Sequence, residues 1–146
     1  MTEFQILKKF NIAIHPPRVP EIKEVLWTPS MINWIKGNTD GSTSNTTSAC
    51  GIIFRDHVAD CLLCLSENLG PGDALRAELC GSMRAIEVAH QKNWLNFWLE
   101  SDSMLVVRAF SNDSIVPWCV SNRWFNCKKL LMDMNFVVSH IYREGN

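Results

Sequence analysis

The chain has 146 residues and a formal net charge of −1. Its 47% hydrophobic and 20% charged residues indicate one folded domain with a substantial core and exclude a disordered chain. The composition lacks the basic excess that usually accompanies nucleic-acid binding, since that binding depends on neutralising phosphates. No apolar run is long enough to cross a membrane, and the first ten residues lack the apolar core of a secretory signal. We therefore expect a monomeric intracellular protein, nuclear or cytoplasmic, that is not secreted.

The first element in chain order is a proline-containing leader or linker, residues 1–30. Its proline-rich stretch at 15–20 predicts an extended backbone. We expect Trp27 and Trp34 to dock this segment onto the body of the protein. The folded domain is predicted to span residues 31–146.

The remaining chain alternates apolar runs with turn residues. In chain order we expect strands 34–38, 50–55 and 58–66, a helix 74–91, a strand 94–100, helices 103–110 and 120–134, and a strand 135–142. The first three strands form an antiparallel meander, whereas the strand–helix–strand connection requires a crossover and parallel neighbours. The predicted fold class is α/β, with a mixed five-stranded sheet flanked by helices in the order β-β-β-α-β-α-α-β. No helix follows the last strand, so we interpret the sequence as truncated before a final helix.

Three acidic residues lie at the ends of two of these expected strands and within the first expected helix. Asp40 follows the first strand, Glu78 lies in the first helix, and Asp102 ends the fourth strand. Taken singly they could be a turn residue, an exposed helix residue and a helix N-cap. Brought together they repel one another unless cations neutralise them, and oxygen ligands suit Mg²⁺ or Mn²⁺. The pattern predicts a site for two divalent ions, a known device for phosphodiester hydrolysis, with Asp40 bridging both ions from the centre of the sheet.

The six cysteines, in a chain without a secretory signal, indicate free thiols in a reducing compartment. Cys61 and Cys64 have the spacing of a zinc-ligand pair, but no second pair follows at zinc-finger spacing. Both lie in an apolar, strand-like run, so we interpret them as strand or core residues. A zinc-binding module built on this pair is the lowest-ranked alternative.

Five segments in order carry a resemblance to a known family: 34–42, 51–56, 77–79, 99–103 and 140–146. In this order and spacing they resemble the plant type-1 ribonuclease H-like domain associated with non-LTR retrotransposon reverse transcriptases. The resemblance extends from about residue 11 to the end of the sequence. It implies a ribonuclease H-like fold and an endonuclease that hydrolyses the RNA strand of an RNA–DNA hybrid.

The resemblance also implies roles for individual residues. Of the four acidic residues in the family's active site, three correspond to Asp40, Glu78 and Asp102. The fourth follows the Arg-Glu-Gly-Asn loop, where this sequence ends. Arg143 and His140 are candidates for handling the attacking water or the departing phosphate, and we favour Arg143 because His140 also fits an ordinary strand position.

Substrate contacts are expected at two places. The polar loop after the first strand offers Gly41, Ser42 and Asn45, whose backbone amides and side chains can reach 2′-hydroxyls and phosphates. Arg123 and Lys128, in the last expected helix, could hold the DNA strand, whereas the neighbouring Trp124 is assigned to the core.

Two alternatives remain open besides the zinc-binding module. The chain could be a catalytically inactive ribonuclease H-fold domain of retrotransposon origin that binds hybrids or other partners. The near-neutral charge favours that reading, and the retention of three mutually repelling carboxylates opposes it. An exonuclease on the same fold is the other alternative, which the Arg-Glu-Gly-Asn sequence at 143–146 opposes.

Overall fold

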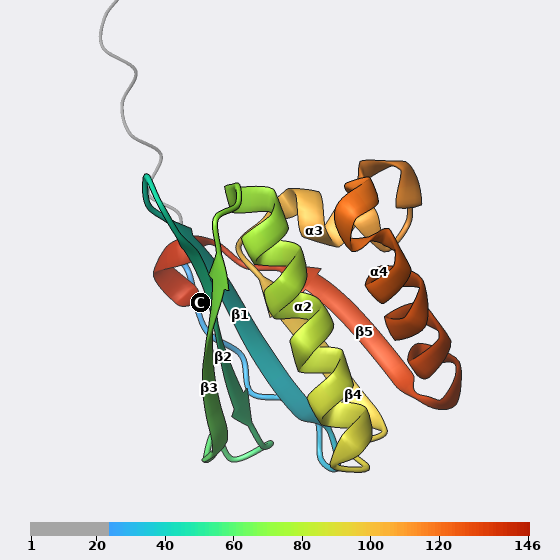
Figure 1. Ribbon diagram of the computed structural model, residues 1–146. Helices are drawn as coiled ribbons and strands as arrows, with labels where there is room; N and C mark the ends of the chain where they lie inside the picture. Colours follow the sequence, from blue (N-terminus) through green and yellow to red (C-terminus); the bar gives the residue numbers. More distant parts are fainter. Residues whose placement is uncertain (1–23) are drawn as a thin grey trace, which may run out of the picture.

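The computed structural model describes residues 24–146, so the predicted proline-rich stretch at 15–20 lies outside the described residues. The elements are β1 (Ile35–Thr43), β2 (Ser48–Arg55), β3 (Cys61–Gly70), α2 (Ala74–Gln91), β4 (Asn96–Ser101), α3 (Met104–Ala109), the 3₁₀ turn η1 (Asp113–Ile115), α4 (Trp118–Leu130), η2 (Leu131–Asp133), β5 (Asn135–His140) and η3 (Arg143–Gly145). Figure 1 shows the resulting sheet with α2 and α3 over it and α4 beside α2. The predicted order of strands and helices is confirmed.

The five strands form one sheet in the order β3-β2-β1-β4-β5. The β1–β2 and β2–β3 pairs are antiparallel, and the β1–β4 and β4–β5 pairs are parallel. The mixed sheet is therefore confirmed, with β1 at its centre. In the parallel ladder Asn38 of β1 lies opposite Glu100 of β4. This register brings Asp40 and Asp102, each two residues further along, to the same end of the sheet.

Strand β1 is longer than predicted and continues to Thr43. Its ladder with β2 runs on through the pair Thr43 and Ser48, so Asp40 lies inside the strand, opposite Gly51. The polar loop expected from residue 42 shrinks to a tight turn in which the Ser44 N–H donates to the Thr47 carbonyl at 2.8 Å. The predicted end of the first strand was wrong because strand pairing, rather than side-chain polarity, decides where a central strand ends.

Strand β3 begins at Cys61 rather than at residue 58. The Asp56 carboxylate accepts hydrogen bonds from the backbone N–H groups of Val58 and Asp60, at 3.0 and 2.9 Å. These bonds hold residues 56–60 in a turn, because an Asp side chain can satisfy backbone donors that a strand would otherwise use.

Helix α2 provides more buried core residues than any other element. It begins at the N-cap Asp73, whose side chain accepts from the Arg76 N–H, and the apolar stripe that includes Leu79, Met83 and Ile86 is fully buried. Trp124 of α4 is 1% exposed, which confirms its assignment to the core. Within residues 24–146, none of the helices is both long and apolar enough to span a bilayer.

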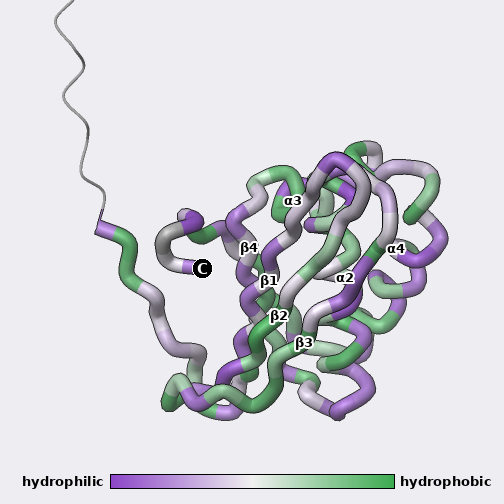
Figure 2. Tube along the Cα trace, turned by 60° about the vertical axis from the view of Figure 1, so that its left-hand side comes forward, coloured by the Kyte–Doolittle hydropathy of each residue, from purple (hydrophilic) through white to green (hydrophobic). Residues whose placement is uncertain are grey.

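The helices cover only one face of the sheet. Figure 2 shows α2 and α4 on one side of the strands, and the segment that leads into β1 together with the chain end on the other side. Trp27 of this segment donates its indole N–H to the Asn38 side-chain oxygen at 3.3 Å, so its predicted docking is confirmed. The second face of the sheet is therefore partly covered by two short terminal segments.

Candidate metal centre at three carboxylates

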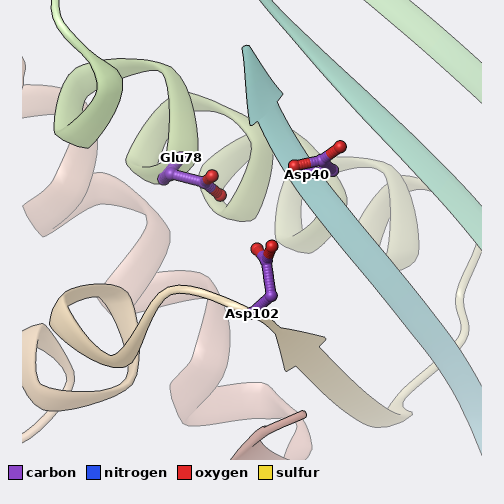
Figure 3. A group of neighbouring side chains, drawn as sticks. All are labelled: Asp40, Glu78 and Asp102. Carbon is purple, nitrogen blue, oxygen red and sulfur yellow. The ribbon is translucent and has the colours of Figure 1, made fainter. Parts of the chain in front are cut away.

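Asp40, Glu78 and Asp102 converge at the end of the sheet (Figure 3). They come from β1, from the first turns of α2 and from the position after β4. One carboxylate oxygen of each lies within 4.8 Å of the corresponding oxygens of the other two. Among the described residues this is the one group of three or more acidic, histidine or cysteine side chains close enough to share a metal ion.

A glycine allows α2 to approach β1 closely enough to form the cluster. A Cβ added to Gly41 would lie 2.7 Å from the Glu78 backbone nitrogen, so any larger residue would push the helix away. The Gly41 backbone also hydrogen-bonds the Glu78 carboxylate. Gly41 therefore sets the position of Glu78 beside the strand that carries Asp40.

The electrostatics of the cluster favour a cation. Burial, together with the negative charges of Asp102 and Asp40, raises the pKa of Glu78 to about 7, while the hydrogen bond from Gly41 and the charge of Arg143 oppose the rise. A bound cation would compensate both the burial of this carboxylate and the negative charge of its two neighbours.

Two carboxylate oxygens in the cluster lack hydrogen-bond partners. They are Glu78 Oε2 and Asp102 Oδ1, both buried, and no donor within the described residues reaches either one. Buried oxygens in proteins are almost always satisfied, so these two atoms fit a site that binds a cation or an ordered water. An oxygen-only donor set with unused lone pairs fits a hard divalent cation such as Mg²⁺ or Mn²⁺.

Arg143 and His140 both contact Asp102. Arg143 Nε donates to Asp102 Oδ2 at 2.9 Å, and His140 Nε2 lies 3.1 Å from the Asp102 backbone oxygen. The Arg143 side chain is 78% exposed, so most of its guanidinium faces solvent beside the cluster. The structure thus brings both predicted residues to the edge of the carboxylate site.

A hollow of about 360 Å³ opens from the carboxylates across the face of the sheet opposite the helices. Asp40, Asp102 and Arg143 line one part of it, and Gly51 of β2 and Cys64 of β3 line another. The acidic cluster is therefore reached from this face of the sheet.

The remaining predicted contact residues lie in two different regions. Gly41 and Ser42 belong to β1 and Asn45 to the following turn, close along the chain to Asp40. Arg123 and Lys128 lie on α4, in the helical layer.

Arg123 and Lys128 are both engaged with carboxylates. Arg123 makes two hydrogen bonds to Glu87, at 2.7 and 2.8 Å, and Lys128 donates to Asp113 at 2.9 Å. Neither is brought to the carboxylate cluster, and each would have to exchange its partner for a phosphate.

The cysteines do not form a zinc site within the described residues. Cys61 and Cys64 have sulfur atoms 3.2 Å apart on the exposed side of β3, and no further metal-ligand side chain joins them. Two ligands fall short of the four in a structural zinc site. All six cysteines are free thiols, as predicted.

Sequence reasoning missed a set of polar residues beside the cluster. Asn146 donates to the Thr39 carbonyl at 2.9 Å, and Asn38 donates to Glu100 at 2.9 Å. The available signal was the spacing of two residues from Asn38 to Asp40 and from Glu100 to Asp102, which in strands indicates a shared face.

The strand order and the position of the acidic cluster define the ribonuclease H fold. The chain is similar to ribonuclease H1 of Halobacterium salinarum, at a TM-score of 0.65 and 18% identity over 76% of this chain and 87% of that one. It is similar to LC11 ribonuclease H1 in complex with an RNA/DNA hybrid, at a TM-score of 0.65 and 21% identity over 77% and 88%. The N-terminal ribonuclease H domain of Rv2228c from Mycobacterium tuberculosis gives a TM-score of 0.68 at 17% identity over 77% and 85%.

Residues 38–146 match the family described as Reverse transcriptase-like, and the chain belongs to that family. An Arabidopsis thaliana protein with a provisional ribonuclease H name is 28% identical over 138 residues, which cover 92% of this chain and 22% of the relative. The chain therefore spans about a fifth of that relative's length. The ribonuclease H-like domain indicated by the sequence motifs is confirmed.

Proposed function

We propose that this chain is an endonuclease that hydrolyses the RNA strand of RNA–DNA hybrids with Mg²⁺ or Mn²⁺ held by Asp40, Glu78 and Asp102. The observation that carries the proposal is the convergence of these carboxylates within 4.8 Å, with two buried oxygens lacking any partner in the described chain. A similar ribonuclease H1 has been solved with an RNA/DNA hybrid, which supports the choice of substrate.

The protein's own residues have separate tasks at this site. When bound, two divalent ions activate a water and neutralise charge on the phosphoryl oxygens. Asp40 would be the ligand shared by both ions, and Glu78 and Asp102 would complete the ligand set. Because burial and like charge raise the pKa of Glu78 to about 7, its carboxyl must lose a proton near neutral pH to become a full ligand.

Arg143 supplies a cation next to the acidic cluster. Its guanidinium holds Asp102 with one nitrogen and exposes the rest to solvent, where it can donate to a phosphate oxygen. His140 contacts the backbone of Asp102, which suits a residue that orients the carboxylate or transfers a proton to the leaving group.

Substrate recognition is assigned to the face of the sheet that bears the hollow. Gly41, Ser42 and Asn45 would contact the sugar–phosphate backbone beside the cleavage point. Arg123 and Lys128 contribute less, because a phosphate must compete with Glu87 and Asp113 for them. This mode of binding reads duplex shape with little sequence preference.

We further propose that the domain derives from a plant non-LTR retrotransposon and acts as a monomer inside the cell, in the nucleus or cytoplasm. The family description and the Arabidopsis relative support this origin. The inactive alternative makes a different prediction, namely hybrid binding without cutting.

The test is cleavage of an end-labelled RNA–DNA hybrid with Mg²⁺ or Mn²⁺ by the full chain and by Asp40→Asn. A matched control is Asp133→Asn, which alters an exposed carboxylate in η2. We expect internal cuts in the RNA strand, a loss of about 100-fold or more in Asp40→Asn, and no change in the control. Binding without cutting by the native chain would favour the inactive domain instead.

A further inference from the structure

A charged lysine is fully buried on the face of the sheet opposite the helices. Lys36 is 0% exposed, which is costly for an ammonium group unless it is paired. Its Nζ lies 2.9 Å from Glu100 Oε2 and donates to the Thr28 carbonyl at 2.7 Å. The same nitrogen lies 4.0 Å from the centre of the Trp98 ring and 4.8 Å from that of Trp27. Burial lowers the pKa of Lys36, and the pairing with Glu100 opposes that effect.

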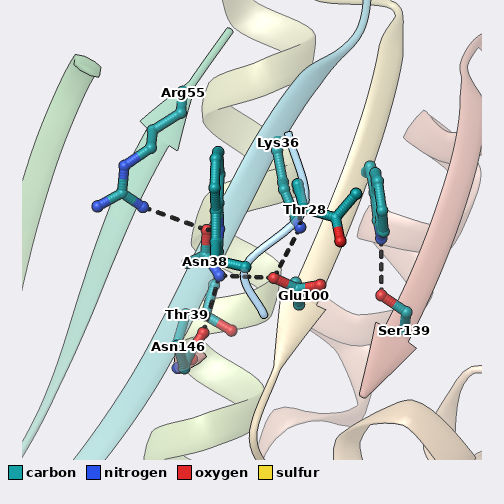
Figure 4. Close-up of polar contacts among 10 residues, drawn as sticks. Thr28, Lys36, Asn38, Thr39, Arg55, Glu100, Ser139 and Asn146 are labelled. Atoms are coloured by element: carbon teal, nitrogen blue, oxygen red, sulfur yellow. Dashed lines mark hydrogen bonds and ion pairs between the residues drawn. The ribbon is translucent and has the colours of Figure 1, made fainter. Parts of the chain in front are cut away.

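The lysine belongs to a continuous polar network (Figure 4). Asn38 Nδ2 donates to Glu100 Oε2 at 2.9 Å and to Asn146 Oδ1 at 3.0 Å. Asn38 Oδ1 accepts from the Trp27 indole, and Asn146 Nδ2 donates to the Thr39 carbonyl at 2.9 Å. Residues 27–28, two central strands and the last residue are thereby tied together.

This network lies next to the metal-binding carboxylates in the sheet. Asn38 and Glu100 are register partners in the β1–β4 ladder. Each precedes a carboxylate of the cluster, Asp40 and Asp102, by two residues, which is the side-chain period of a strand. A shift of the Asn38–Glu100 pair would therefore change the distance between the two aspartates.

The segment before β1 also contacts the turn that carries Arg143. A Cβ added to Gly145 would collide with the Val25 side chain and would lie 2.9 Å from Ile141 Cδ1. Val25 thus fills the space beneath η3, while Asn146 fastens the end of the same turn to β1. The turn is held from both sides, and its Arg143 contacts Asp102 at 2.9 Å.

We propose that Trp27 and Lys36 are positioning residues for the carboxylate site and that segment 24–30 is part of the functional unit rather than a linker. Trp27 closes over Lys36 and holds Asn38, and these contacts fix both the spacing of the aspartates and the placement of the 143–146 turn. The consequence for cation binding rests on the proposed function, whereas the consequence for the order of the turn does not.

The experiment compares full chains carrying Trp27→Leu and Trp27→Phe with the native protein. Phenylalanine keeps an aromatic face over Lys36 but removes the N–H that Asn38 accepts, so it separates the two contacts. The matched control is Trp118→Leu, because Trp118 lies on α4 and is 89% exposed. Mn²⁺ affinity is measured by calorimetry well below the melting temperature of each variant. Amide hydrogen exchange is measured at Ile141 and Gly145, whose N–H groups donate to the carbonyl oxygens of Ser101 and Tyr142, respectively.

Trp27→Leu is expected to weaken Mn²⁺ binding about 10-fold and to speed exchange at Ile141 and Gly145, with no change in α2. Trp27→Phe gives a smaller effect of the same kind and decides the question should the leucine variant fail to fold. A lowered melting temperature with native Mn²⁺ affinity and native exchange in the turn would show a purely structural role and overturn the proposal. Should the native chain bind no Mn²⁺, the proposed function fails, and the exchange data still decide whether Trp27 orders the turn.

Discussion

Replacing Glu78 by glutamine should make the metal-free protein more stable at alkaline pH. Glu78 is 7% exposed, and burial followed by the charges of Asp102 and Asp40 raises its pKa to about 7 from the ordinary 4.5. The pKa of Glu78 is higher in the folded state than in the unfolded chain. The protonated carboxyl therefore stabilises the fold fully at pH values below the unfolded-state pKa, and this stabilisation is lost as the pH rises through about 7. The variant Glu78→Gln keeps the shape of the protonated acid and removes the titration.

The difference between the folded-state and unfolded-state pKa of Glu78 corresponds to a loss of about 3 kcal/mol in the free energy of unfolding at pH values above 7. The adjacent hollow admits solvent that screens the charge, so we expect a gain of about 2 kcal/mol for Glu78→Gln at pH 8 and little difference at pH 5. The assay is urea denaturation in EDTA from pH 5 to pH 8, with Asp133→Asn as the exposed control. Saturating Mn²⁺ should stabilise the native chain and not the variant.

The reasoning would be refuted if the free energy of unfolding of the native chain, compared with that of Glu78→Gln, did not fall between pH 5 and pH 8. Destabilisation by the glutamine at pH 8 without metal would refute it equally, because the cluster would then lack the repulsion that we infer.

Gly41→Ala should lower the free energy of unfolding, measured by urea denaturation, by about 1–3 kcal/mol and should weaken Mn²⁺ binding, because the added Cβ would lie 2.7 Å from a backbone nitrogen of α2. Unchanged Mn²⁺ affinity would contradict the role assigned to Gly41. Lys36→Met should lower the free energy of unfolding by about 3–5 kcal/mol because it leaves Glu100 buried without its cation. Lys92→Met, at an exposed position, should leave the free energy of unfolding unchanged. A methionine variant as stable as the native chain would count against the buried pair. Arg143→Ala should slow hybrid cleavage roughly 10–100-fold with little change in melting temperature, since the side chain is 78% exposed; an equal rate would remove Arg143 from the site.

The order of elements was predictable because the apolar periodicity is strong and the turns are marked by polar residues. The convergence of Asp40, Glu78 and Asp102 also followed from their predicted places at two strand ends and in a helix, although Asp40 lies inside β1. The end of β1 was not predictable, because its continuation to Thr43 depends on pairing with β2 and not on local composition.

The network around Lys36 could not be derived from the sequence pattern. A lysine in a strand ordinarily indicates a solvated face. The burial of Lys36 depends on Trp27 from the segment before β1 and on Trp98 and Glu100 from β4. Arg123 and Lys128 resembled a free basic patch for the same reason, since their partners Glu87 and Asp113 come from other elements.

The central claim is that Asp40, Glu78 and Asp102 hold divalent cations, and paramagnetic Mn²⁺ tests it most directly. Substoichiometric Mn²⁺ added to the ¹⁵N-labelled full chain should broaden the amide signals around Gly41, Glu78 and Asp102 first, with no broadening in Asp40→Asn. Broadening centred elsewhere, such as on Cys61 and Cys64, or unchanged broadening in Asp40→Asn, would contradict the account.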